Sequence, residues 1–346
     1  MFMERHSGHR AGCLRMIMKK RTGLLGSIDA ALATAGIAMA LAGCIVHRGE
    51  PGAVDRTFTV SSPVRLELTN GAGDSRVTVG PPGIVTIHAD FRVKAWSEHS
   101  ARRRTDEMKM NPPFSQEGNL IRVGGGGLHA SAVVFNFRIL VPPETEIHAI
   151  SGSGKTEVNG VKGPVVVTTG SASISVADVA GDVQARSGSG TIQLASIQGQ
   201  VQATAGSGDI SLSSVHGDTR IQTGSGLIRI ASPAGAVVAS TGSGSVSVSG
   251  PMEDLRLRTS SGNIAVAGDP QGGTYWDFRT SSGNVALQVS PKAGFRFYAK
   301  TNSGDIDAAI PVVMEGTAGK HALRARIGDG KGRVEVETSS GNVALH

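Results

Sequence analysis

The chain is poor in cysteine, with two among its 346 residues, Cys13 and Cys44, and both lie near its start. The body of the protein therefore has neither a disulfide framework nor a cysteine-based metal site. Aromatic residues are also scarce, at 4% of the chain. Because large aromatic side chains dominate most globular cores, this scarcity argues against a conventional globular core. Val, Ile, Ala, Ser and Thr take their place, and these residues suit narrow stacked strands.

A strongly basic body is absent as well. The formal net charge is +6, but the first 43 residues alone carry +4, which leaves +2 for the remainder. The high isoelectric point thus comes mainly from the N-terminal segment, so it gives little support to nucleic-acid binding by the body. We therefore expect no nucleic-acid partner.

The N-terminal segment has the pattern of an export signal. The basic cluster Lys19–Arg21 precedes an apolar run, Leu24–Ala40, which is interrupted by Asp29. The sequence Leu-Ala-Gly-Cys follows and ends at Cys44. A basic start, an apolar run and a small-residue cleavage site predict a secretory signal. The alternative, a transmembrane anchor, is disfavoured because the run is short and contains an acidic residue.

This segment resembles the signal of bacterial lipoproteins. The resemblance implies cleavage before Cys44, a diacylglyceryl group on its sulfur, and attachment to the membrane through that lipid. Ile45 follows the cysteine in place of the Asp that retains lipoproteins at the inner membrane. We therefore expect an exported protein anchored to the cell envelope, at the outer membrane.

The body repeats with a period of 18 residues. The period is marked by the last residue of a Ser-Gly cluster, at Gly154, Ala172, Gly190, Gly208, Gly226, Gly244 and Gly262. Apolar columns recur at fixed distances after the marker, two residues later at Ile174, Ile192, Ile210, Ile228, Val246 and Ile264. Polar residues alternate with them. The pattern predicts two short strands per coil, joined by two turns, with the apolar columns inside.

The sequence therefore predicts an all-β fold, a right-handed β-helix-like solenoid of about 18 residues per coil. We expect the turn glycines to supply positive φ angles, and the serine before each marker to bind backbone groups of the stacked turns. Ser97–Met110 lacks the strand period and predicts one short helix, capped by Ser97. The chain ends on a strand, so we expect an exposed C-terminal edge that needs a cap or a partner.

These patterns divide the chain into four segments. The expected divisions are a lipoprotein signal peptide (1–43), a tether (44–53), a β-rich start of the solenoid (54–147) with an insertion (94–132), and regular repeats (148–346).

The later repeats resemble a known family. The pattern Thr-x-Ser-Gly-Asn/Asp-Ile/Val occurs at Thr259–Ile264, Thr280–Val285 and Thr301–Ile306. With its lead-in, this pattern resembles the bacterial putative-adhesin family of unknown function over about residues 57–346. The resemblance implies a β-helix-like fold and brings no catalytic residues.

Three chemical motifs are weighed and set aside. Ala149–Thr156 matches a loose phosphate-binding loop, but a strand rather than a helix is expected after it, so we predict no nucleotide. The aspartates form no column of the kind that calcium-binding repeats need, and the histidines lack ligand spacing, so we predict no metal or cofactor. Adjacent carboxylates on successive coils are not seen, so we predict no enzyme.

The outward-facing cations offer the candidate binding surface. Arg220, Arg229, Arg256 and Arg258 fall on the middle coils, where an envelope glycan or protein is the candidate partner. The alternative interpretation is scattered charge that keeps the surface soluble. The cluster Arg102–Arg104 on the predicted helix is interpreted as a solvated face rather than as a contact for lipid head groups. We predict a non-catalytic, envelope-anchored solenoid that acts as an adhesin-like binding or scaffold module. A polysaccharide-active β-helix enzyme and an envelope-stress signalling partner are the alternatives.

Overall fold

A computed structural model describes residues 50–125, 133–250, 252–316 and 319–346. These residues belong to one of the two compact units of the chain, His47–His346. The predicted signal, the predicted lipidation site Cys44 and part of the predicted tether lie outside the described residues. No helix within the described ranges is long and apolar enough to cross a membrane.

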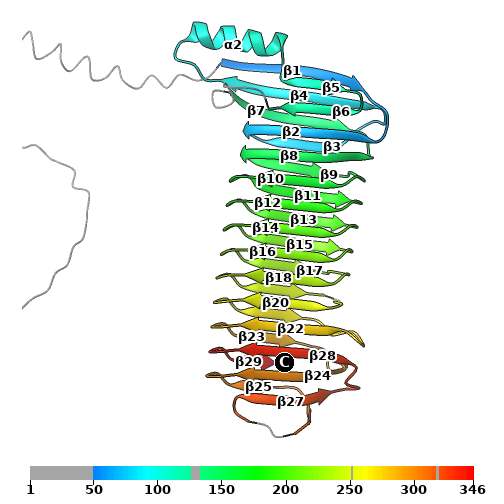
Figure 1. Cartoon of the computed structure of the whole chain (residues 1–346), viewed down its shortest axis with the longest axis vertical. Coiled ribbons are helices and arrows are strands. Elements are labelled where there is room, and N and C mark those ends of the chain that lie inside the picture. Colours follow the sequence, from blue (N-terminus) through cyan, green and yellow to red (C-terminus); the bar gives the residue numbers. More distant parts are fainter. Residues whose placement is uncertain (1–49, 126–132, 251, 317–318) are drawn as a thin grey trace, which may run out of the picture. The chain divides into compact units, whose positions relative to one another are not determined.

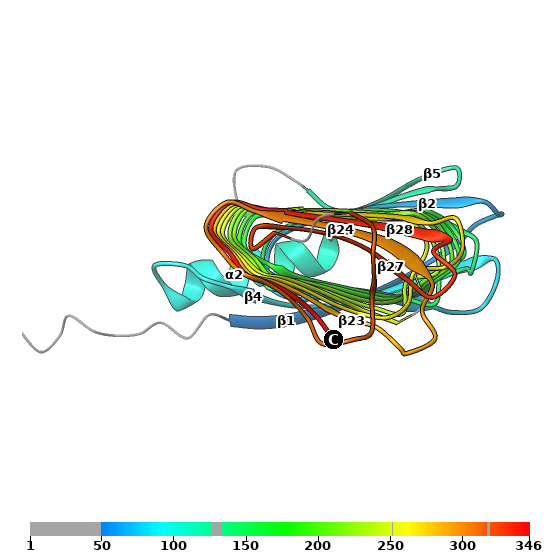
Figure 2. The ribbon, with the colours of Figure 1, turned by 90° about the horizontal axis from the view of Figure 1, so that it is seen from below.

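The described unit is a stack of flattened coils with one β-sheet on each long side (Figures 1 and 2). We name the two sheets A and B. Sheet A contains, in stacking order, β1 (Glu50–Thr59), β4 (Ile84–Val93), β7 (Val133–Val141), β3 (Ser75–Val79), β9 (Lys155–Asn159), β11 (Ser173–Val179), β13 (Ile192–Ile197), β15 (Ile210–Val215), β17 (Ile228–Ala231), β19 (Val246–Ser249), β21 (Ile264–Ala267), β23 (Val285–Gln288), β29 (Val343–Leu345) and β25 (Ile306–Ala308).

Sheet B follows the same stack on the opposite side. It contains β5 (Phe114–Glu117), β6 (Leu120–Gly124), β2 (Val64–Ala72), β8 (Thr145–Ser153), β10 (Val165–Thr169), β12 (Val183–Ser187), β14 (Val201–Ala205), β16 (Thr219–Thr223), β18 (Val237–Thr241), β20 (Leu255–Thr259), β22 (Tyr275–Thr280), β28 (Gly332–Thr338), β24 (Phe295–Thr301), β27 (Ala322–Ile327) and β26 (Val313–Met314). The all-β solenoid is confirmed.

The 18-residue period is the register of the parallel ladders. Ile174 pairs with Ile192 and Ile192 with Ile210, while Val183 pairs with Val201 on the other sheet. The predicted inward columns are buried, with Ile192 and Ile210 fully inaccessible to solvent. Because β-strands alternate their faces, every second residue of each strand enters the core and the residues between them form the outer surface.

The buried hydroxyl column is not the one that the sequence suggested. Ser189 and Ser225, which precede marker glycines, are exposed. The buried hydroxyl stands three residues before the marker, as in Thr223, whose Oγ1 accepts from Gly226 N at 3.2 Å and donates to Gly208 O at 3.1 Å. Both bonds recur at Thr241, Thr259, Thr280, Thr301 and Thr338. The column therefore links each coil to the one before it.

The marker glycines are required by close approach rather than by positive φ. A Cβ on Gly226 would lie 2.0 Å from the carbonyl oxygen of Gly208, and one on Gly244 would lie 1.8 Å from that of Gly226. Positive φ occurs at the opposite turn, six residues after the marker, at Gly160, Asp178, Ser196, Ser214, Ser232, Gly250 and Gly268. The expectation that the marker glycines supply positive φ was therefore wrong from Gly190 onward. Glycine is needed at these markers because the stacked backbone leaves no room for a side chain.

The N-terminal end of the stack is closed by antiparallel structure. β4 pairs antiparallel with both β1 and β7, and β5 pairs antiparallel with β6. The predicted helix is confirmed as α2 (Glu98–Met110), with the Oγ of Ser97 accepting from Ser100 N as its N-cap. α2 packs on β1 and β4 and lies across this end (Figures 1 and 2). α2 therefore covers this end of sheet A, whereas β5 is the outermost strand of sheet B.

The C-terminal end departs from the order of the chain. β28 pairs with β22 on one side and β24 on the other, and β29 likewise lies between β23 and β25. The last coil of the chain is thus inserted into the stack, where its red ribbon lies between yellow and orange coils (Figure 1). The expected exposed C-terminal edge is wrong, because β29 is paired on both edges. β27 instead closes the stack by pairing antiparallel with β24.

Candidate functional site

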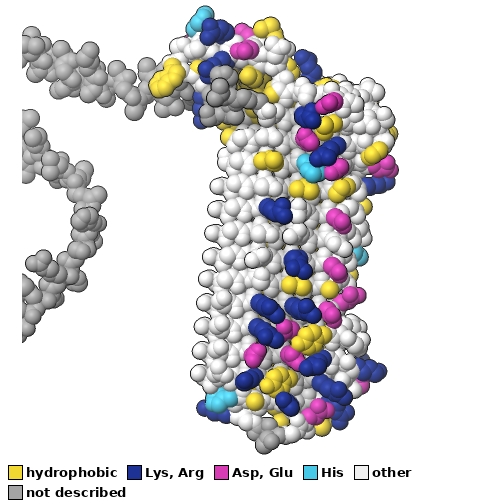
Figure 3. Space-filling view, in the orientation of Figure 1, with side chains coloured by type: hydrophobic (Ala, Val, Ile, Leu, Met, Phe, Trp, Pro, Cys, Tyr) yellow, Lys and Arg dark blue, Asp and Glu magenta, His cyan; other side chains and the backbone are white. Residues whose placement is uncertain are grey.

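The two outer faces of the stack differ sharply in charge over the coils from β16 onward. The strands of sheet A there carry one cation, Arg229, and one acid, Asp307. The strands of sheet B carry nine cations against three acids, Asp277, Glu335 and Glu337. We call these nine the arginine face: Arg220, Arg256, Arg258, Arg279, Arg296, Lys300, Arg324, Arg326 and Arg333. Figure 3 shows Lys and Arg gathering on the lower part of this side of the stack.

Three of the four predicted arginines belong to this face. Arg220 lies on β16, and Arg256 and Arg258 lie on β20, all with exposed side chains on sheet B. Arg220 and Arg256 share one row, since both pair with Val238 of the intervening strand. Arg229 lies on β17 of sheet A, so the structure does not bring it together with the others. The sequence interpretation that grouped all four in one patch was incorrect. Each coil contributes one strand to each sheet, and Arg229 lies on the strand that belongs to sheet A.

The inserted last coil adds residues that the sequence interpretation missed. It places Glu335 beside Asp277 and Arg333 beside Tyr275 in register, although these pairs are almost 60 residues apart in the chain. The Tyr275 hydroxyl donates to Glu335 Oε2 at 2.5 Å, and the Arg333 guanidinium lies 5.6 Å from the Tyr275 ring centroid. A similar pair follows, with Arg324 located 5.0 Å from the ring of Tyr298. The face therefore combines cations with partly exposed aromatic rings.

The acids on the face hold some of its cations in place. The buried carboxylate of Asp277 accepts from Arg279 Nε at 2.9 Å and lies 3.6 Å from Arg258. Hydrogen bonds from Tyr275 and Arg333 lower the pKa of Glu335, so it remains ionised near neutral pH. Among the described residues, five cations of the face make no ion pair with an acid: Arg220, Arg256, Arg296, Lys300 and Arg324. These five side chains are exposed and therefore available to an anionic partner.

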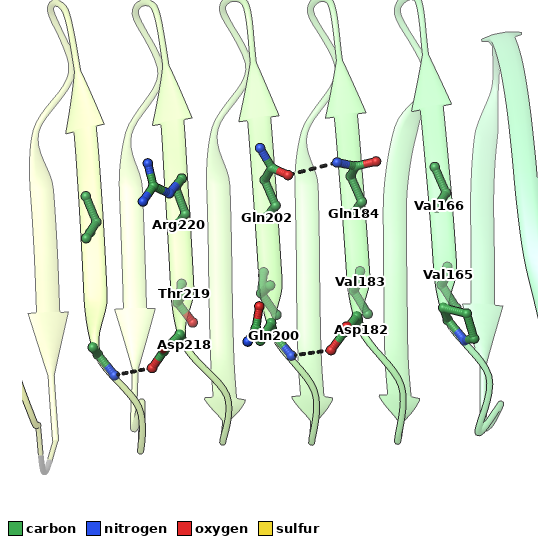
Figure 4. A pocket seen from close by; sticks show the side chains of 14 residues that line it. Val165, Val166, Asp182, Val183, Gln184, Gln200, Gln202, Asp218, Thr219 and Arg220 are labelled. Atoms are coloured by element: carbon green, nitrogen blue, oxygen red, sulfur yellow. Dashed lines mark hydrogen bonds between the residues drawn. The ribbon is translucent and has the colours of Figure 1, made fainter.

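A shallow groove of about 720 Å³ leads up to this face from the N-terminal side (Figure 4). Its floor is the outer surface of five strands of sheet B, namely β10, β12, β14, β16 and β18. Gln184 Nε2 donates to Gln202 Oε1 at 2.8 Å, and the carboxylate of Asp182 accepts from the backbone N–H of Gln200 at 2.8 Å. Arg220 borders the groove beyond these amides. The groove therefore combines the carboxylates of Asp182 and Asp218 with neutral amides, and it continues into a cationic surface.

The alternative chemistries find little support in the described part of the chain. Ala149–Thr156 spans the strands β8 and β9, with no helix after it, and Lys155 forms an ion pair with Glu157. No group of three or more His, Cys, Asp or Glu is placed to hold a metal ion within residues 50–125, 133–250, 252–316 and 319–346. Asp182 and Asp218 are used to accept backbone N–H groups of the next coil. Polar side chains on these coils thus maintain the stack.

Comparison with known families decides the relationship. A family model described as Toastrack DUF4097 matches residues 143–346, which include the regular coils and the whole arginine face. The chain belongs to the Toastrack DUF4097 family. The comparison with curated proteins gives no significant match. Among solved structures, the chain is similar to a putative cell adhesion protein from Clostridium sporogenes ATCC 15579, with 12% identity and a TM-score of 0.25. That alignment covers 86% of this chain and 99% of the other.

The Toastrack match begins at residue 143 and therefore leaves the N-terminal cap outside it. The cap contains β1 to β7 and α2, including the antiparallel strands that close the stack. The repeated coils and the arginine face are thus the part that this chain shares with the family model, whereas the cap lies outside the matched range.

Proposed function

We propose that this Toastrack protein is a non-catalytic, adhesin-like binding module of the bacterial cell envelope, which binds an anionic glycan on the arginine face. The observation that carries the proposal is the confinement of charge to one side, with a net +6 on the sheet B strands from β16 onward and none on the matching sheet A strands. A positive field on one face attracts polyanions and orients them on binding.

The repeat gives this face a spacing that suits a polymer. Arg220 and Arg256 lie two coils apart in one row, which corresponds to roughly 10 Å at the usual strand separation. Arg258 and Arg279 are direct neighbours in the next outward row. Guanidinium groups bind carboxylates and sulfates in bidentate geometry, and partly exposed tyrosine rings provide apolar contact area. An acidic polysaccharide offers both kinds of group at regular intervals.

The paired carboxylates favour binding over hydrolysis. Contrary to the sequence interpretation, which found no adjacent carboxylates on successive coils, Asp277 and Glu335 are adjacent on neighbouring coils. This is the arrangement that a glycan-cleaving enzyme would need. A general acid requires a raised pKa, however, and hydrogen bonds from Tyr275 and Arg333 lower that of Glu335. Asp277 is buried and already engaged by Arg279 and Arg258. Their geometry supports a role in positioning the arginines.

We propose attachment through a lipid on Cys44, after export and removal of residues 1–43. The basis is the sequence pattern that ends at this cysteine. Replacing Cys44 by Ser should abolish incorporation of radiolabelled palmitate, and the precursor should keep its N-terminal segment. Labelling of the Cys44→Ser variant to the level of the wild type would refute the anchor.

Binding to polygalacturonate, dextran sulfate and neutral dextran tests the ligand class. The Arg256→Gln/Arg258→Gln double variant should bind both anionic polymers at least tenfold more weakly, because each charge-assisted hydrogen bond contributes about 1.5–3 kcal/mol. Arg229→Gln is the control for a cation outside the arginine face, since it removes one positive charge from sheet A, against two in the double variant, and should leave affinity unchanged. Equal losses in both variants, or equal binding to neutral dextran, would overturn the proposal, and release of shorter chains would indicate an enzyme.

A further inference from the structure

The N-terminal cap carries a fully exposed tryptophan. Trp96 precedes α2 and its exposed fraction is 100%, whereas the other tryptophan of the chain, Trp276, is completely buried. Large aromatic side chains are rarely left entirely in water, because burying them is strongly favourable. Met110, at the far end of α2, is also 70% exposed. Apolar groups therefore flank the outward side of the helix at both ends.

Cationic side chains surround these apolar groups. Residues 91–110 contain six Lys and Arg against three Asp and Glu, a net charge of +3. Lys94, Arg102 and Arg103 are exposed, while Ala101 and Thr105 are buried against the cap. α2 therefore turns its small residues inward and its long cations outward. Exposed tryptophan beside cations is the pattern of a segment that lies in the interface of an anionic bilayer.

The position of Trp96 agrees with this assignment. Glu50, the first residue of β1, pairs with Val93 at the end of β4, only three residues before Trp96. Cys44 stands six residues before Glu50, so an extended chain would reach at most about 20 Å from this corner of the cap. A lipid on Cys44 would therefore hold the Trp96 corner next to the bilayer surface.

In place of the solvated face that the sequence suggested for Arg102–Arg104, we propose that the cap docks on an anionic lipid surface. Trp96 is inserted at the level of the head groups, and Arg102 and Arg103 face the lipid phosphates. The proposal rests on the proposed lipid anchor for its location, although the docking surface itself is made of residues of the cap. The cap would then hold the stack at the membrane by two attachments, so that the arginine face at the other end is presented away from it.

Tryptophan fluorescence tests the docking directly, because Trp96 is the single solvent-exposed tryptophan and Trp276 is shielded in the core. The purified full chain is mixed with vesicles of phosphatidylcholine, with and without phosphatidylglycerol. The expected result is a blue shift of the emission with the anionic vesicles, and quenching by lipids brominated near the head of the acyl chain. Trp96→Ala should abolish both signals.

Charge and site controls sharpen the test. The Arg102→Gln/Arg103→Gln double variant should partition about 25-fold more weakly onto anionic vesicles, since each surface cation contributes roughly fivefold. Val313→Ala, which shortens an exposed apolar side chain at the other end of the stack, should behave as wild type. Emission that is unchanged by anionic vesicles would overturn the proposal, as would a blue shift without vesicles that grows with protein concentration, because a second copy would then cover Trp96.

The outcomes also separate docking from anchoring. An unchanged Trp96 spectrum together with Cys44-dependent membrane attachment refutes the docking and leaves the anchor in place. A vesicle-dependent shift in the Cys44→Ala full chain supports the docking even where the anchor fails.

Discussion

The hydroxyl column offers the sharpest test of what holds the coils together. Thr223 accepts from Gly226 N and donates to Gly208 O, and both bonds are buried. Replacing Thr223 by Val keeps the shape of the side chain and removes both bonds. The two orphaned backbone groups cost about 2–4 kcal/mol, and the added methyl group returns about 0.8 kcal/mol. We therefore expect a net loss of about 1–3 kcal/mol in the free energy of unfolding.

The matched control is Ser225→Ala in the same turn. Ser225 is exposed, and the structure gives its hydroxyl no hydrogen bond among the described residues, so its removal should change stability by less than about 0.5 kcal/mol. Urea unfolding of each variant, followed by far-ultraviolet circular dichroism, measures the difference. An equal effect of the two substitutions, or a larger loss for Ser225→Ala, would show that the inter-coil hydroxyl column has been assigned to the wrong residues.

Three further outcomes follow from the same geometry. Ala205 occupies the column position between Ser187 and Thr223, so Ala205→Thr should restore the hydroxyl and raise the urea midpoint by the equivalent of about 1 kcal/mol. Gly244→Ala should destabilise by at least about 3 kcal/mol in the same assay because its Cβ would lie 1.8 Å from a backbone oxygen, whereas Gly272→Ala, whose Cβ meets only a lysine side chain, should be tolerated. Because the pKa of Glu335 is lowered in the folded protein, its contribution to stability is present above the ordinary glutamate pKa and is lost as the pH falls through the lowered value. Thermal melts between pH 6 and pH 3 should accordingly show a weaker acid dependence for Glu335→Gln than for the wild type, and identical profiles would contradict this.

The sequence was sufficient to predict the coils because each coil repeats the same alternation of apolar and polar positions. Inward positions such as Ile192 and Ile210 recur at a fixed distance and are apolar in every coil, so their column and burial follow from periodicity alone. The helix Glu98–Met110 was predictable for a similar reason, since its cap and its lack of a strand period are local signals. The sequence could not show whether Ser225 or Thr223 is buried, because both are small hydroxyl residues of one turn. Only the packing of the coils shows that Thr223 is inside.

The arginine face was predictable only in part. Arg220 and Arg256 were found because the regular period places them outward. The pairing of Tyr275 with Arg333, and of Asp277 with Glu335, depends on which coil stacks on which. The coils of this region share the same Thr-x-Ser-Gly turn, at Thr280–Gly283, Thr301–Gly304 and Thr338–Gly341. Any one of these turns could therefore stack on any other with the same contacts. Period and composition therefore cannot specify their order.

The order of the coils leads to a prediction that distinguishes the observed stack from one in which the coils follow each other in chain order. If the coils were stacked in chain order, ending the chain after Lys331 would remove the last coil and leave the others intact. In the structure, the same truncation removes β28 from between β22 and β24 and β29 from between β23 and β25. It also takes away Val334, the register partner of the buried Phe297. Residues 295–327 would then lose their ladder to the stack, because solenoid coils are stabilised by their direct neighbours. Hydrogen exchange should show that these residues lose protection in the truncated protein while residues 165–241 retain theirs. Full protection of residues 295–327 after truncation would mean that the last coil lies at the end of the stack.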